Sequence, residues 1–147
     1  MTNIMKKVFQ ILSVFFFLAS CSQTDLAPIT IQTSNEDVTY FVEIADTEEK
    51  MIKGLMYREH LNEDSGMIFV FDSSHPQPIA MWMKNTYISL DMLFVSKENI
   101  IIGIAQNTEP LSLKTIRPTN EASAYVIELN AGEVKKHNIK VGNKVLY

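Results

Sequence analysis

Residues 66–96 constrain the fold of this chain most strongly, because they contain two apolar runs separated by a loop and a polar cluster. Residues 66–71 are apolar at every position, which predicts a strand covered on both faces. Residues 72–78 contain two prolines and several turn formers, so they predict an exposed loop. Residues 80–83 and 87–96 then predict two strands that meet at the polar cluster.

The polar cluster and its neighbours give the most concentrated mixture of chemical groups in the chain. They are Trp82, which is the only tryptophan, Lys84, Asn85, Thr86 and Asp91. In a strand over 87–96, Asp91 has the same parity as Tyr87 and Ser89. We therefore expect Asp91 among polar neighbours, on the face opposite the main core.

The remaining elements are short and do not alternate strictly between strand and helix. Capping-box spacing at Asp46 and Asn130 predicts the starts of two short helices. In chain order, we predict strands over 38–45, 100–105, 122–129 and 144–147 and helices over 47–53 and 131–138. The predicted fold class is α+β, with a mainly antiparallel β-sheet curled into a partly closed small barrel.

The N-terminus has the organisation of a bacterial lipoprotein signal. Lys6 and Lys7 precede an apolar run over 8–18, and Leu-Ala-Ser then leads directly to Cys21. This predicts a signal peptide over 1–20, a lipid-anchored flexible tether over 21–36 and a single globular domain over 37–147. Within the tether, a short edge strand over 29–33 is an alternative. The alternatives are a soluble secreted protein in which Cys21 is incidental, or an uncleaved membrane segment.

Lipidation of Cys21 would determine where the domain is located and would exclude chemistry that needs a free thiol. The domain would be exported and anchored to the cell membrane or outer membrane, facing the periplasm or exterior, and Ser22 favours the outer membrane. Cys21 is the only cysteine, so its modification would exclude disulfides and thiol catalysis. Removing residues 1–20 takes away two lysines and no acid, which changes the net charge from −4 to −6. An acidic domain of this kind does not favour a nucleic acid partner.

Several ordered motifs resemble one known family. They are Gly54-Leu55-Met56 with Arg58, Gly66-Met67-Ile68-Phe69, Trp82-Met83-Lys84-Asn85-Thr86 with Leu90-Asp91, and Tyr125-Val126-Ile127-Glu128-Leu129 with Ala131-Gly132 and Gly142. Together they resemble domain-of-unknown-function family 192 over about residues 37–147. Two positions depart from the family pattern, with Ser89 in place of a usual Pro and Asn138 in place of a usual Gly. The resemblance implies a small mixed α/β domain, often behind an export signal, with no established activity.

The leading functional hypothesis is that the protein binds a polar, sugar-like small molecule or a protein partner at 82–91. Trp82 would stack on a planar or sugar-like face, while Lys84, Asn85, Thr86, Asp91 and Arg58 would bind its polar edges. The alternative is that Asn85 and Thr86 only close the turn, that Asp91 pairs with Lys84 or Arg58, and that Trp82 belongs to the core.

A second hypothesis is an envelope hydrolase that uses Asp91 and Glu128 as its acid and base. Glu128 shares strand parity with Ala124 and Val126, so we expect it to be partly buried, with a raised pKa unless it is paired. A salt bridge to Arg58 would explain Glu128 equally well. A third hypothesis is a purely structural envelope protein.

No cofactor or metal site is predicted. The methionines invite a Cu(I) interpretation, although Met is also a common core residue; they are Met51, Met56, Met67, Met81 and Met83. The three histidines are scattered, and the sequence contains no phosphate-binding loop or nucleophile motif.

Overall fold

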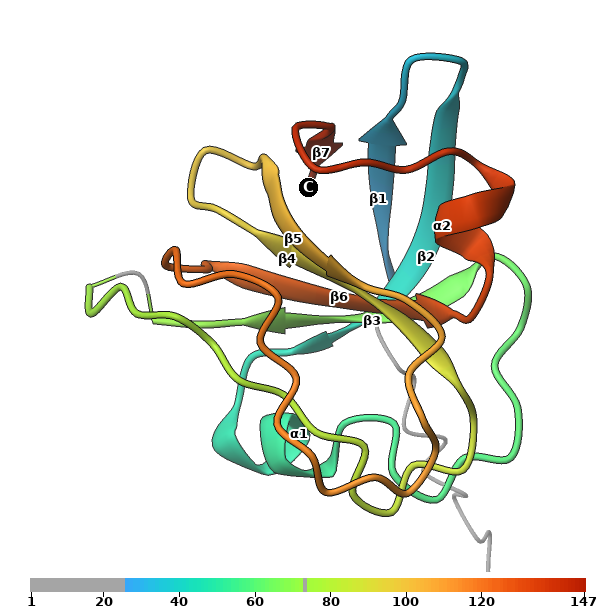
Figure 1. Cartoon of the computed structure of the whole chain (residues 1–147), viewed down its shortest axis with the longest axis vertical. Helices are drawn as coiled ribbons and strands as arrows, with labels where there is room; N and C mark the ends of the chain where they lie inside the picture. The colour runs from blue at the N-terminus through green and yellow to red at the C-terminus, as the bar shows by residue number, and fades with distance from the viewer. Residues whose placement is uncertain (1–25, 73) are drawn as a thin grey trace, which may run out of the picture.

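The computed structural model describes residues 26–72 and 74–147, which form one seven-stranded sheet and two short helices (Figure 1). The strands are β1 (Leu26–Gln32), β2 (Asp37–Ala45), β3 (Ser65–Val70), β4 (Leu90–Val95), β5 (Ile101–Ala105), β6 (Tyr125–Asn130) and β7 (Lys144–Leu146). The helices are α1 (Glu48–Lys53) and α2 (Glu133–Lys136). Neither helix in this part of the chain has the length and apolar character that crossing a bilayer requires.

The sheet is mostly antiparallel and nearly closes on itself. Its strand order is β5-β4-β6-β3-β2-β1-β7, and among these neighbours β2 and β3 are the parallel pair. A single bridge between Ile100 and Lys144 joins the start of β5 to β7, which brings the two edges of the sheet together. The predicted α+β fold with a partly closed barrel is therefore confirmed.

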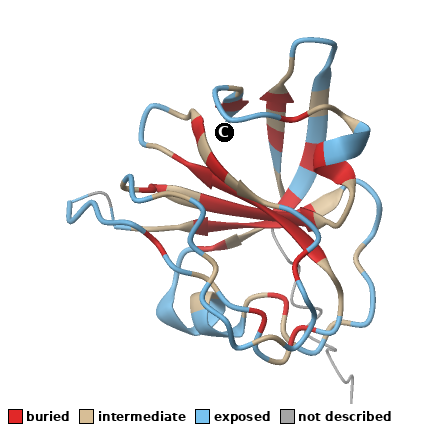
Figure 2. Cartoon of the chain, viewed as in Figure 1, coloured by how far each residue is buried: buried red, intermediate tan, exposed pale blue. Residues whose placement is uncertain are grey.

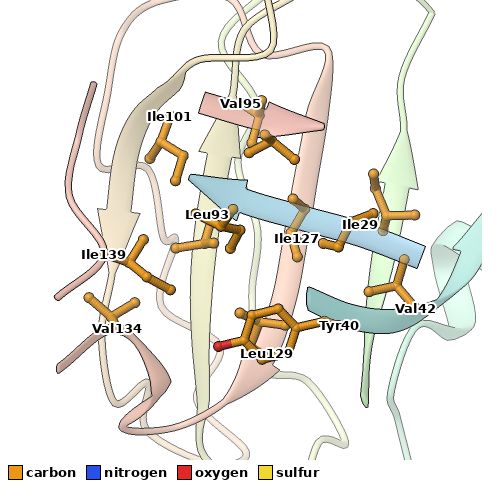
Figure 3. Packing of buried hydrophobic residues seen from close by; sticks show 13 residues of the cluster. Ile29, Tyr40, Val42, Leu93, Val95, Ile101, Ile127, Leu129, Val134 and Ile139 are labelled. Atoms are coloured by element: carbon orange, nitrogen blue, oxygen red, sulfur yellow. The ribbon is translucent and has the colours of Figure 1, made fainter. Parts of the chain in front are cut away.

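The sheet carries a separate hydrophobic core on each face. The inner core takes side chains from all seven strands and from the α2 region, and includes Tyr40, Leu93 and Ile127 (Figure 3). The outer core lies where α1 and the long connections cover β3, β4 and β6, and includes Phe69 and Met92 (Figure 2). Strands β3 and β4 are consequently buried on both faces, as predicted for residues 66–71.

Strand β1 lies inside the segment that the sequence assigned to a tether, so the predicted boundary at residue 37 is wrong. Residues 26–32 pair with β2 along their whole length, and residues 30–32 also pair with β7. Ile29 and Ile31 are completely buried in the inner core. Folding of the domain therefore involves the chain from Leu26 onward.

Two of the predicted strands in the central stretch are wrong or too long. Met81 makes one isolated bridge to Ile116, so residues 80–83 do not form a strand. Strand β4 begins only at Leu90, and residues 84–89 form a turn and an irregular connection. This irregular segment instead forms part of the layer that covers the outer core.

Both predicted helices exist, but neither has the predicted cap. Thr47 caps α1, because its hydroxyl accepts a hydrogen bond from the Lys50 N–H at 3.3 Å, whereas Asp46 binds the Lys50 ammonium group at 2.8 Å. Helix α2 begins after Gly132, which has a left-handed backbone. Asn130 instead donates its side-chain amide to the carbonyls of residues 61 and 62.

Candidate functional site

Asp91 is a structural residue of the inner core. Its side chain is fully buried and accepts hydrogen bonds from the N–H groups of Asn107, Gly132 and Val134, at 2.8, 3.0 and 2.9 Å. The Asp91 carboxylate therefore supplies the N-terminal cap that α2 lacks in its own sequence. The expected polar surroundings are wrong, because both faces of β4 are buried. Asp91 pairs with neither Lys84 nor Arg58.

Asn85 and Thr86 hold the turn that follows Trp82. Asn85 has a positive φ of 54°, its carbonyl accepts from the Tyr57 N–H at 2.8 Å, and its amide donates to the Tyr57 hydroxyl at 2.8 Å. Thr86 is buried, and its hydroxyl donates to the Lys84 carbonyl at 3.3 Å. The Thr86 bond is the local bond expected for a turn-closing residue. The Asn85 bonds instead fix the turn to Tyr57, which is distant in sequence.

Arg58 is paired with Glu43 and with none of the other predicted ligand-binding residues. Its guanidinium group binds both carboxylate oxygens of Glu43, at 2.5 and 2.7 Å. This hydrogen bonding is the main reason that the pKa of Arg58 is raised. The expected alternatives, in which Arg58 pairs with Asp91 or with Glu128, are both wrong.

Trp82 and Lys84 are at the surface, beside an open groove. Trp82 is 51% exposed, so it is not a core residue, and the Lys84 ammonium group lies 5.2 Å from the centroid of its ring. The groove has a volume of about 580 Å³, which is within the usual range for small-molecule sites. Its walls come from α1, the end of β3 and the connections at 80–82 and 113–115, and are formed by Glu48, Met51, Ile52, Phe69, Phe71, Ala80, Met81, Trp82, Leu113 and Thr115.

A small cavity continues from the same wall of the groove to Glu128 on β6. The cavity has a volume of about 30 Å³, enough for one water molecule or one small chemical group. Groove and cavity share Met51, Ile52, Phe69, Met81 and Trp82. The further cavity residues are Lys53, Gly54, Leu55, Met56, Lys84, Thr86 and Glu128.

Glu128 is buried without a partner, which makes it the most unusual ionisable group of this site. Glu128 is 4% exposed, and its side chain takes part in no hydrogen bond or salt bridge found within residues 26–72 and 74–147. Its carboxyl oxygens are not fully enclosed, because the fully enclosed side-chain atom without a partner in this part of the chain is Ser123 Oγ. Burial raises the pKa of Glu128 to about 8, so the carboxyl group is mostly protonated at neutral pH. The expected burial of Glu128 is confirmed, and the hydroxyl hydrogen of its neutral form is available to an acceptor in the cavity.

The two proposed catalytic carboxyl groups lie on opposite faces of the sheet. Glu128 is directly opposite Met92 in the β4–β6 pair, so both side chains are on the outer face. Asp91 precedes Met92 in the same strand, so its side chain points to the inner face. The predicted acid–base pair of Asp91 and Glu128 is therefore wrong.

The described part of the chain contains no cluster of three or more His, Cys, Asp or Glu side chains suited to a metal ion. Of the methionines, Met67 and Met83 are buried core residues, whereas Met51, Met56 and Met81 line the cavity. Cys21, the predicted lipidation site, lies outside the described residues.

Comparison with protein-family models identifies the chain. The model of DUF192, described as "Uncharacterized ACR", matches residues 29–147, which is most of the sequence and nearly all of the described domain. This chain belongs to the DUF192 family. The match begins within β1, in agreement with a folded domain that includes this strand.

Two solved structures are similar to this DUF192 domain. A protein of unknown function from Novosphingobium aromaticivorans is 32% identical, with a TM-score of 0.78, and the match covers 83% of this chain and 85% of that chain. A proposed transcription regulator from Sinorhizobium meliloti is 38% identical, with a TM-score of 0.76 and coverage of 81% and 91%. A comparison with curated protein sequences gave no match.

Proposed function

We propose that this DUF192 protein is a lipid-anchored envelope protein that binds a small ligand in the groove beside Trp82. The observation that carries this proposal is the wall that an open, largely apolar groove shares with a small cavity beside the buried carboxyl group of Glu128. Buried polar groups are normally hydrogen-bonded, and each exception requires a cause, such as strain, a functional role, or a bound water molecule or ion. A ligand would cover apolar surface in the groove and satisfy Glu128 in the cavity.

The geometry favours a ligand with an apolar body rather than the sugar-like molecule expected from the polar cluster. Asn85, Thr86 and Asp91 use their polar groups within the protein, and Arg58 binds Glu43. Trp82 still offers an exposed aromatic face to a bound molecule. Of the predicted ligand-binding residues, we therefore retain Trp82 and Lys84 and add Glu128.

The proposed location is the cell envelope, and it is supported by the signal and lipobox that end at Cys21. The description of the S. meliloti relative as a proposed transcription regulator applies to that protein. The net charge of −6 without residues 1–20 favours no nucleic acid partner for the present chain.

The groove can be tested with N-phenyl-1-naphthylamine, an uncharged apolar dye, and with the emission of Trp82. Because Trp82 is the only tryptophan, energy transfer to a bound dye reports directly on this site. We expect saturable binding to the native domain and about fivefold weaker binding to Leu113→Ser, since the substitution removes apolar surface from the groove wall.

Val141→Ser is the matched control, because Val141 is 61% exposed, close to the 69% of Leu113, but lies outside the groove. Val141→Ser should bind the dye as the native domain does. Absence of saturable binding, or equal affinity of the native domain and both variants, would contradict a ligand site in the groove.

A further inference from the structure

We propose that the ligand is an aliphatic carboxylate, whose chain lies in the groove and whose carboxylate accepts a hydrogen bond from Glu128 in the cavity. This inference rests on the proposed function, because it assumes that the groove binds a small molecule. It adds the chemical class of the ligand and the orientation in which the ligand enters.

The site has two parts of different size, one suited to the hydrocarbon chain of a ligand and the other to its polar end group. The groove of about 580 Å³ is lined mainly by apolar and aromatic side chains, including Phe69, Phe71 and Leu113, and accommodates a flexible hydrocarbon chain. The adjoining cavity of about 30 Å³ admits only a small terminal group. A linear amphiphile has this combination of a long apolar part and a compact polar end.

The charges around the cavity favour an anionic end group. The basic residues of the cavity lining are Lys53, from α1, and Lys84, from the turn after Trp82, and both are exposed at the surface. Glu128 is mostly neutral at pH 7 because burial raises its pKa to about 8. Glu48 is the acidic residue of the groove wall, and it does not line the cavity. The cavity lining therefore combines two basic residues with the hydrogen-bond donor of neutral Glu128.

An ammonium end group would require the opposite protonation state of Glu128. It would pair with the ionised carboxylate, so its affinity would rise as the pH increases toward and above 8. A carboxylate needs the proton of Glu128 as a donor, so its affinity would fall over the same range. The sign of the pH dependence therefore distinguishes the two classes of ligand.

The test uses octanoate, octanol and octylammonium as matched probes, and Trp82 emission as the signal. At pH 6.5 we expect the native domain to bind octanoate at least tenfold more tightly than octanol or octylammonium. Between pH 6.5 and 9.5 its affinity for octanoate should fall at least tenfold, since Glu128 loses over this range the proton that it donates to the ligand.

Glu128→Gln and Glu128→Leu separate hydrogen bonding from packing. The Gln amide donates a hydrogen bond at every pH. Glu128→Gln should therefore bind octanoate with nearly native affinity at pH 6.5, and this affinity should not decrease toward pH 9.5. Glu128→Leu has no donor and should bind octanoate about tenfold more weakly at pH 6.5. Lys84→Met should also weaken octanoate binding, whereas Lys97→Met, at an exposed turn outside the groove, should not.

Tighter binding of octylammonium with an affinity that rises with pH would overturn the inference. Equal affinity for octanoate and octanol, or unchanged octanoate binding by Glu128→Leu, would also overturn it. If the naphthylamine dye binds while all three octyl probes fail, the carboxylate assignment is wrong and the groove is still a binding site. If the dye also fails, both proposals are wrong.

Discussion

At the scale of single residues, Asp91 and Glu128 show how a carboxyl group takes different roles on the two faces of a sheet. Asp91 faces the inner core and accepts three backbone N–H groups. Glu128 faces the outer core and has no partner among the described residues. Substitution of the first should therefore affect stability, whereas substitution of the second should affect the site.

Asp91→Ala should destabilise the domain by about 3–5 kcal/mol, because three backbone N–H groups lose their buried acceptor and α2 loses its cap. Urea denaturation monitored by circular dichroism measures the loss. Asp91→Asn retains one side-chain oxygen and should lose less. A cost below about 1 kcal/mol for Asp91→Ala would contradict the capping role.

Glu128→Gln should change the pH dependence of stability. The folded pKa of Glu128 is about 8 and its ordinary value is 4.5, so the unfolded chain releases this proton at lower pH than the folded protein does. The native protein therefore loses stability from about pH 4.5 to pH 8, after which this penalty remains constant. Relative to the native protein, Glu128→Gln should gain a few kcal/mol over this range.

Thermal or urea denaturation of both proteins at several pH values measures this difference. The comparison between pH values cancels the constant cost or benefit of the Gln side chain itself. A difference in stability between the two proteins that is the same at pH 4.5 and pH 8 would contradict the raised pKa of Glu128.

At the scale of elements, β1 is the part of the domain that the tether prediction left out. Its Ile29 and Ile31 are completely buried, and β7 reaches the sheet through β1. A soluble form that starts at Leu26 should fold, whereas a form that starts at Thr33 should be unfolded or strongly destabilised, since each buried isoleucine contributes about 1.5–3 kcal/mol. Circular dichroism and amide dispersion in NMR spectra compare the two. Equal folding of both forms would contradict the role of β1.

The sequence predicted those strands well whose burial leaves a clear pattern. Residues 38–45 are rich in β-branched and aromatic side chains, and residues 66–71 are apolar throughout; both became strands. Strand β1 was assigned to the tether, with only residues 29–33 considered as a short edge strand, because residues 22–36 are mostly small and polar. Its burial comes from pairing with β2 and β7, which are distant in sequence or separated by a turn. Residues 80–83 look like a strand only because they cover the outer core.

The candidate site was predicted in part. The features that were not predicted depend on contacts between residues that are distant in sequence. Trp82 and Lys84 were found because they are unusual residues in an apolar context, and Glu128 because its parity indicated burial. The role of Asp91 was wrong, since its partners at Asn107 and Val134 are distant in sequence. The groove wall from α1 was missed for the same reason, because no local pattern brings a helix at 48–53 against residues 80–82.

At the scale of the whole molecule, the proposed anchor at Cys21 makes a prediction about location. In a bacterial host that processes lipoproteins, the native chain should be recovered in the membrane fraction with an acylated N-terminal cysteine, and Cys21→Ser should be recovered in the soluble fraction. Mass spectrometry of the mature N-terminus and immunoblots of the two fractions provide the measurement. An unmodified thiol at Cys21, or equal membrane association of both proteins, would contradict the anchor.

The start of β1 at Leu26 limits how far an anchored domain can move. Five residue steps separate Cys21 from Leu26, so the fully extended connection spans at most about 18 Å. An acylated protein would thus stay close to the membrane. Its domain could rotate above the lipid headgroups but could not move far from them. Any molecule that it captures must come to the bilayer surface, or already reside there.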